Sequence, residues 1–179
     1  MKKQPNRFGG GARTNANGLH FEQTTSLTIA LINAGYTVTQ TPEKTIVFKN
    51  GKKIGIVVSQ NQLYKGFLTP QGINYKDYNS KKWCPDDAFI NFENQTAYII
   101  EKKFQNTSGS VDEKLPNCHF KKLEYQKLFC NDKLNFKVEF IYIFNDWFQD
   151  PRYKDTLQYI IDTGCHYYYN EIPLNLLGL

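Results

Sequence analysis

The stretch from Trp83 to Gln105, WCPDDAFINFENQTAYIIEKKFQ, decides the fold of this chain. Apolar runs at 88–92 and 96–100 are separated by three polar residues, a pattern that predicts two strands joined by a turn. Asp86 stands where the first strand begins, and Glu101 follows the apolar part of the second. Because the start of one strand lies beside the end of the other in an antiparallel hairpin, we expect these acids to converge at one end of a sheet.

The alternation of side chains along a strand sorts the residues after Ile100. It places Glu101, Lys103 and Gln105 on one face and Lys102 on the other. Two converging carboxylates suit a hard cation such as Mg²⁺, and an ammonium beside them can position a water or stabilise charge on a phosphate. The spacing therefore indicates a metal site at the end of the hairpin.

The order Pro85-Asp86, fourteen residues, then Glu101-Lys102-Lys103 resembles the signature of the PD-(D/E)XK nucleases, a fold group that includes many restriction endonucleases. Each half alone is a common surface feature, a turn start or a solvated helix face. The combination is more specific because both halves stand at matched ends of one predicted hairpin.

The resemblance implies that Asp86 and Glu101 bind Mg²⁺, with a backbone carbonyl near Lys102 as a further ligand. Lys103 would orient or deprotonate the attacking water. Asp87 competes with Asp86 for the ligand role, since neighbours in a strand face opposite ways; we choose Asp86 because it follows the proline.

Two further site residues are implied by the same resemblance. Glu22 lies in a segment similar to the first helix of several restriction enzymes, where it would serve a second metal; the alternative is a glutamate on a helix surface. Gln105 would order water.

Composition limits the class of protein. The chain has 179 residues, enough for one domain, and 15% of them are aromatic, which is typical of a folded chain. No apolar run approaches the roughly 20 residues of a membrane helix, and we expect no membrane partner. The four cysteines lack C-x-x-C spacing, which favours free thiols and a cytoplasmic location. Gly9-Gly10-Gly11 lacks the ending of a phosphate-binding loop, so no nucleotide cofactor is expected.

Charge divides the chain into two halves. Residues 1–82 hold twelve Lys and Arg against three acids, a balance of +9, whereas residues 83–179 hold ten against fourteen, a balance of −4. This segregation indicates an anionic polymer held by the first part and a cation held by the second. The alternative is that the excess of lysine reflects a soluble protein from a lysine-rich proteome.

The order of predicted elements gives the fold class. We expect a flexible basic arm at 1–17 and a single nuclease domain at 18–179. The predicted elements are a helix at 18–34, strands at 36–39, 45–48 and 54–58, a long loop at 59–82, the hairpin, a helix at about 117–130, a strand at 136–144, a helix from Pro151 to Gly164 and a strand at 166–169. This order resembles the αβββαβ core of restriction-endonuclease-like proteins, an α/β (α+β) fold with a central mixed sheet flanked by helices.

Basic and amide side chains in the first half are candidates for contact with DNA, because Lys and Arg bind phosphates and amides read base edges. The candidates are Arg7 and Arg13 in the arm, Gln62, Lys65, Asn74, Lys76, Lys81 and Lys82 in the 59–82 loop, and Lys114 behind the hairpin. The alternatives are that the arm is a disordered tail and that the loop is solvent-exposed and has no role in binding.

The function implied is a Mg²⁺-dependent endonuclease that hydrolyses double-stranded DNA, as a homodimeric type II restriction enzyme. Two alternatives stay open: a junction-resolving or repair nuclease, and a non-catalytic DNA-binding module on the same fold.

Overall fold

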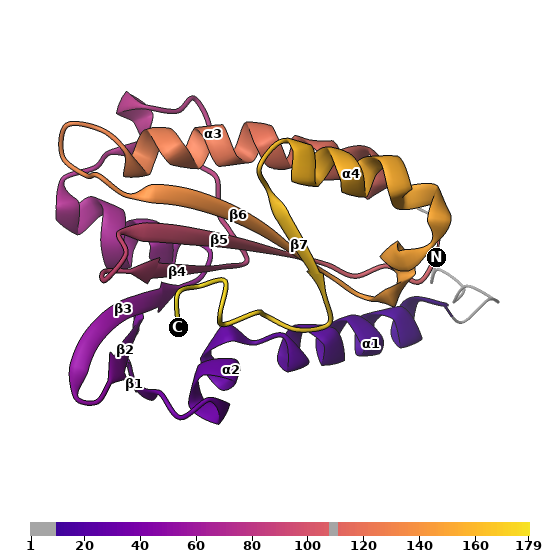
Figure 1. Cartoon of the computed structure of the whole chain (residues 1–179), viewed down its shortest axis with the longest axis horizontal. Coiled ribbons are helices and arrows are strands. Elements are labelled where there is room, and N and C mark those ends of the chain that lie inside the picture. The colour runs from indigo at the N-terminus through magenta and orange to yellow at the C-terminus, as the bar shows by residue number, and fades with distance from the viewer. Residues whose placement is uncertain (1–9, 108–110) are drawn as a thin grey trace, which may run out of the picture.

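The computed structural model describes residues 10–107 and 111–179, with the backbone alone for residues 10–16. Within them the order of helices and strands is α1 (Gly10–Thr24), α2 (Leu27–Asn33), β1 (Thr37–Gln40), β2 (Thr45–Lys49), β3 (Lys52–Val58), β4 (Asp87–Asn91), β5 (Thr96–Lys103), α3 (Cys118–Phe129), β6 (Lys137–Phe144), α4 (Lys154–Asp162) and β7 (His166–Tyr169) (Figure 1). A π-helical turn spans Leu63–Leu68, and short 3-10 turns span Thr69–Gln71, Tyr75–Asp77, Asp112–Asn117, Asp146–Gln149 and Pro151–Tyr153. No helix among the described residues is long and apolar enough to span a bilayer.

The described strands form one seven-stranded mixed sheet in the sequential order β1 to β7. The four strand pairs from β1–β2 to β4–β5 are antiparallel, whereas β5–β6 and β6–β7 are parallel. Asn50 and Gly51 close the β2–β3 hairpin with φ of 52° and 77°, the left-handed conformation that a two-residue hairpin turn requires. The predicted mixed sheet, the central hairpin and the final strand at 166–169 are confirmed.

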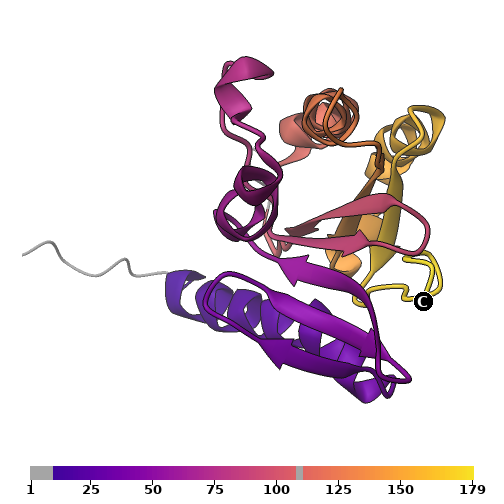
Figure 2. The ribbon, with the colours of Figure 1, turned by 90° about the vertical axis from the view of Figure 1, so that its left-hand side faces the viewer.

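Helices cover both faces of the sheet (Figures 1 and 2). On one face, Tyr125 and Leu128 of α3 and Ile160 of α4 pack against the odd-numbered side of β5, which includes Ile99. On the other face, α1 and α2 pack with the C-terminal segment against the even-numbered side of β5, which includes Ile100. Because β5 is covered on both faces, its apolar residues read as a continuous run.

The first helical segment differs from the prediction of one helix at 18–34. It is two helices, because Thr25 and Ser26 interrupt the pattern of backbone hydrogen bonds along the helix. The Thr25 hydroxyl donates to the Phe21 carbonyl at 2.7 Å, and the Ser26 hydroxyl accepts from the Ile29 N–H as the N-cap of α2. Helix α1 begins at Gly10, so residues 10–17, assigned to the flexible arm, are helical instead. Residues 1–9 lie outside the described part.

The segment 59–82 differs from the predicted long loop. Its π-helical turn is largely buried, with Leu63 and Leu68 fully enclosed in the core on the α3 face. The Tyr64 hydroxyl donates to the Trp83 carbonyl at 2.6 Å. The apolar residues between the lysines therefore fasten this segment to the sheet, close to where β4 begins.

The later helices bury only part of their surfaces. Lys121 and Lys122 of α3 are only 19% and 21% exposed and form ion pairs. In α4, Ile160 is buried, whereas Ile161 is 47% exposed. The chain enters α3 through the 3-10 turn Asp112–Asn117, which contains Pro116.

Candidate active site

Asp86, Glu101 and Lys103 meet at the end of the β4–β5 hairpin. The Lys103 ammonium lies 2.9 Å from Glu101 Oε2 and 3.9 Å from Asp86 Oδ2. The Asp86 carboxylate also accepts the Lys102 backbone N–H at 2.7 Å, which fixes the residue before β4 against β5. Glu101 is 5% exposed, so its charge is held inside the protein by its partners.

Three oxygens converge on the Lys103 ammonium. Besides the two carboxylates, the Lys102 carbonyl accepts from Lys103 Nζ at 3.1 Å. The oxygens predicted to bind a metal thus already surround the Lys103 ammonium, which occupies the position predicted for the metal ion. No group of three or more His, Cys, Asp or Glu side chains gathers anywhere in the described ranges. Two carboxylates and a carbonyl fit Mg²⁺, which keeps several waters and takes few protein ligands.

Asp87 lies on the opposite face of the hairpin. Its carboxylate pairs with the Lys102 ammonium at 2.7 Å and accepts the Ser59 hydroxyl at 2.6 Å. Both of its oxygens therefore have partners away from Glu101. The geometry groups Asp86, and not Asp87, with Glu101, and the choice of Asp86 as the metal ligand stays a prediction.

Lys121 is a residue of this site that sequence reasoning missed. Its ammonium lies 3.0 Å from Glu101 Oε1 and 5.7 Å from the centre of the Trp83 ring. Its position in α3 carries a signal: it falls between Cys118 and Tyr125, at the three- and four-residue spacing of a buried stripe. A lysine in such a stripe needs a buried acidic partner, and Glu101 is that partner.

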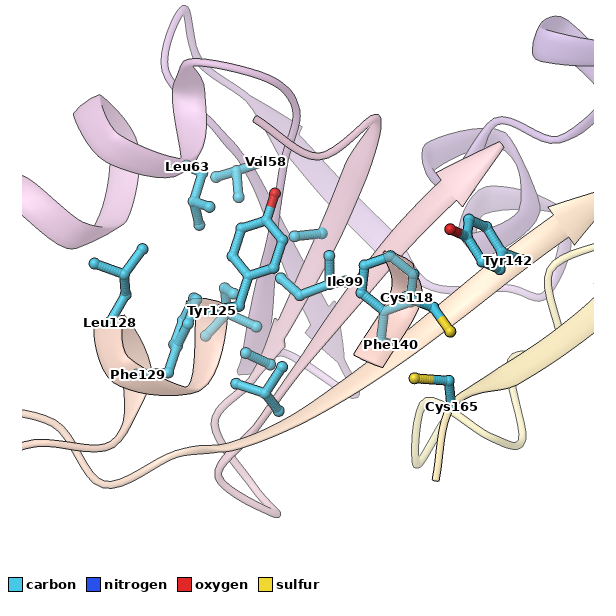
Figure 3. Close-up of a cluster of buried hydrophobic side chains, with 14 of the residues drawn as sticks. Val58, Leu63, Ile99, Cys118, Tyr125, Leu128, Phe129, Phe140, Tyr142 and Cys165 are labelled. Carbon is cyan, nitrogen blue, oxygen red and sulfur yellow. The ribbon is translucent and has the colours of Figure 1, made fainter. Parts of the chain in front are cut away.

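Tyr125, one turn beyond Lys121, places a hydroxyl close to the site. It projects from α3 towards Val58 and Leu63 (Figure 3). Within the described part of the chain, this buried hydroxyl has no hydrogen-bond partner. Burial raises the pKa of Tyr125, and the negative charges of Glu101 and Asp86 add to the effect. The hydroxyl is therefore neutral and able to donate a hydrogen bond.

Glu22 and Gln105 are not brought into direct contact with the central cluster. Glu22 is exposed on α1, and its neighbour Phe21 packs on Phe104 with ring centres 5.7 Å apart, on the face opposite Glu101. Gln105 is buried, and its amide donates to the Thr107 carbonyl. Its side-chain oxygen has no partner among the described residues, which leaves it able to accept from a water.

The candidate DNA contacts fall into two groups. Gln62 and Asn74 serve the local structure: Gln62 bonds to Ser59 N and to the Pro42 carbonyl, and Asn74 caps the turn at Tyr75–Asp77. The lysines are at the surface or against aromatic rings; Lys65, Lys76, Lys81 and Lys114 are exposed, and the Lys82 ammonium lies 4.5 Å from the centre of the Tyr64 ring. Arg7 lies outside the described residues, and of Arg13 only the backbone, in α1, is described.

A cavity of about 420 Å³ lies along the 59–82 segment. Tyr64, Tyr75, Asn74 and Lys82 contribute to its walls. The hydrogen bond from Tyr64 to the carbonyl of Trp83 connects the cavity to the segment that leads into Asp86. The cavity therefore has aromatic and cationic walls and contacts the chain three residues before Asp86.

One family model matches part of the chain. Residues 86–143, from Asp86 into β6, match the family model described as PD-(D/E)XK nuclease superfamily domain. No curated protein and no solved structure shows a significant match. The matched segment contains Asp86, Glu101 and Lys103, and the mixed sheet with flanking helices is consistent with that fold. Residues 86–143 of the chain are therefore similar to a PD-(D/E)XK nuclease superfamily domain.

Proposed function

We propose that the protein is a Mg²⁺-dependent endonuclease that hydrolyses phosphodiester bonds in double-stranded DNA, as type II restriction enzymes do. The observation that carries the proposal is the convergence of Glu101 Oε2, the Lys102 carbonyl and Asp86 Oδ2 on a single ammonium, 2.9, 3.1 and 3.9 Å away. Nucleases of this superfamily generally use divalent metal ions, and this set of oxygens matches the preference of Mg²⁺.

The residues would divide the work as follows. Asp86, Glu101 and the Lys102 carbonyl would hold the ion, which when bound neutralises charge on the phosphate and acidifies water. Lys103, displaced from the position between these oxygens, would turn its ammonium towards the attacking water or the phosphate. Gln105 would accept from a water through its unpartnered oxygen, and Glu22 would have to move from its exposed position to serve a second ion.

The substrate contacts would come from the segment that leads into Asp86. Lys81 and Lys82 lie over the rings of Trp83 and Tyr64, at 4.3 and 4.5 Å from the ring centres, so their ammoniums are held on one surface beside the site. Phosphate contacts from Lys65, Lys76 and Lys114, which are exposed, would extend this surface. Asn74 and Lys82 also line the cavity, where they would meet a base edge or a phosphate.

A restriction enzyme that cuts both strands of a palindromic site needs two active sites related by symmetry. We therefore include a homodimer and a cytoplasmic location in the proposal, on the strength of the resemblance to restriction endonucleases and of the free thiols.

Digestion of plasmid DNA by the purified protein tests the proposed function. With Mg²⁺ we expect discrete fragments from a plasmid, no fragments in the presence of EDTA, and no fragments with Asp86→Asn. Cleavage confined to branched or damaged substrates would indicate a junction-resolving or repair nuclease instead. DNA binding without any cleavage, in the presence of Mg²⁺, would indicate a binding module.

A further inference from the structure

Glu101 is held by two lysines from different elements. Lys103 of β5 lies 2.9 Å from Oε2, and Lys121 of α3 lies 3.0 Å from Oε1. Each oxygen of this nearly buried carboxylate therefore has its own ammonium. The two lysines are not equivalent, because only Lys103 occupies the point where Asp86 and the Lys102 carbonyl also converge.

Because they contact different oxygens of Glu101, Lys103 and Lys121 would respond differently to a bound metal ion. A cation held at the central position would take the place of the Lys103 ammonium beside Oε2, where Lys121 does not reach, because Lys121 contacts Oε1. Carboxylates that bind metals are themselves oriented by hydrogen bonds to their remaining oxygen. We propose that Lys121 is a positioning residue, which holds Oε1 so that Oε2 faces the metal; this inference rests on the proposed function.

The surroundings of Lys121 suit a fixed donor. Its side chain is 19% exposed, and its ammonium lies 5.7 Å from the centre of the Trp83 ring. The Trp83 indole is itself held, because its N–H donates to Glu124 Oε2 at 3.3 Å. The Lys121 ammonium is thus held between Glu101 and the ring of Trp83, so little conformational freedom remains to be lost when Glu101 binds a cation.

The positive charge of Lys121 and its hydrogen bond to Glu101 have opposite effects on the binding of a metal ion. The Lys121 ammonium repels a divalent cation nearby, so any neutral replacement removes a repulsion as well as altering the contact with Glu101. A comparison between two neutral variants cancels the charge effect. Lys121→Gln keeps an N–H donor on a side chain one bond shorter, whereas Lys121→Met has similar length and no donor.

The test is calorimetric titration of each full-length variant with Mg²⁺ alone, without DNA. We expect Lys121→Met to bind Mg²⁺ about 10- to 100-fold more weakly than Lys121→Gln, the range found when an outer partner of a metal ligand is removed. The matched control is the pair Lys122→Gln and Lys122→Met, because Lys122 is the next residue of α3 and pairs with Glu139, away from Glu101. These two control variants should bind equally.

Equal affinity of the two Lys121 variants, or tighter binding by Lys121→Met, would overturn the positioning role while leaving the proposed function intact. A lack of Mg²⁺ binding by the unsubstituted protein would overturn the proposed function and this inference with it. Thermal melting of all four variants shows whether each is folded, and a Lys121→Arg variant that binds Mg²⁺ more tightly than Lys121→Met supplies a second comparison with a donor of sufficient length.

Discussion

The two faces of the β4–β5 hairpin end hold similar residues in different arrangements. On one face Asp86, Glu101 and the Lys102 carbonyl surround the Lys103 ammonium. On the other face the Asp87 carboxylate pairs with the Lys102 ammonium and accepts the Ser59 hydroxyl. Each face thus has an aspartate and a lysine that are adjacent in sequence to those of the other face.

The difference lies in how many oxygens share one cation. On the Asp87 face one carboxylate and one ammonium are 2.7 Å apart, with side chains 13% and 12% exposed, and they balance each other. On the Asp86 face two carboxylates and a carbonyl converge on the central ammonium, so the oxygens that a divalent ion prefers are already gathered at one point. Strand alternation therefore separates a candidate metal site from a structural ion pair.

The largest expected effect is the loss of cleavage when an acid of the Asp86 face is neutralised. Asp86→Asn and Glu101→Gln each remove a ligand charge from the proposed ion, so plasmid cleavage in Mg²⁺ should fall below detection. Gel-based cleavage at several Mg²⁺ concentrations measures this. The matched control Asp87→Asn should cut DNA at any temperature where it remains folded, and a loss of cleavage equal to that of Asp86→Asn would contradict the assignment of the two faces.

Lys103→Ala should lower the cleavage rate by about 10²- to 10⁴-fold, the contribution typical of a residue that transfers or positions a proton. DNA binding should be retained because the proposed phosphate contacts lie elsewhere. Single-turnover cleavage and a binding titration in Ca²⁺ separate these two quantities. A full cleavage rate in the variant would remove Lys103 from the mechanism.

The Asp87 face should matter for stability. Asp87→Asn leaves Lys102 without its charged partner in a largely buried position, which we expect to lower the free energy of unfolding by about 2–4 kcal/mol. Urea unfolding measures the change. The exposed pair of Lys52 and Glu93 is the control: Glu93→Gln should cost about 0–1 kcal/mol because both side chains are well exposed, at 72% and 41%. A cost for Asp87→Asn as small as that of the control would mean that its ion pair is not structural.

The smallest expected effect concerns lysines outside both faces. If Lys65 and Lys76 bind phosphates, each substitution by Ala should make the plot of log affinity against log salt shallower by about 0.9 for each phosphate that the variant no longer neutralises. Lys137, at the opposite end of β5 and β6, is exposed and serves as control. Fluorescence anisotropy with a labelled duplex measures the slopes, and equal slopes for all variants would place the phosphate contacts elsewhere.

Local patterns were sufficient to predict most of the sheet. The alternation after Ile100 predicted the opposite directions of Lys102 and Lys103, and the apolar runs at 45–48 and 54–58 predicted two strands, because each pattern depends on neighbours in the chain alone. The break between α1 and α2 was missed, since Thr25 and Ser26 compete for backbone hydrogen bonds only when tertiary packing favours a change of direction.

The pairing of Lys121 with Glu101 was missed for another reason. Lys121 and Lys122 are adjacent, and a helix surface with several lysines is ordinarily solvated. Their partners, Glu101 and Glu139, are on strands, and only the packing of α3 on the sheet brings them near. The burial of the 59–82 segment likewise depends on the space between α3 and the sheet, which no local pattern encodes.

Calorimetric titration of Mg²⁺ into Asp86→Asn and Asp87→Asn tests the difference between the two faces most directly. We predict that Asp86→Asn loses measurable Mg²⁺ binding, because one of the two carboxylates around the Lys103 ammonium has been neutralised. We predict that Asp87→Asn binds Mg²⁺ with the affinity of the unsubstituted protein, because its carboxylate faces Lys102 and Ser59. Unchanged affinity in Asp86→Asn, or loss of binding only in Asp87→Asn, would contradict the assignment of the metal site to the Asp86 face.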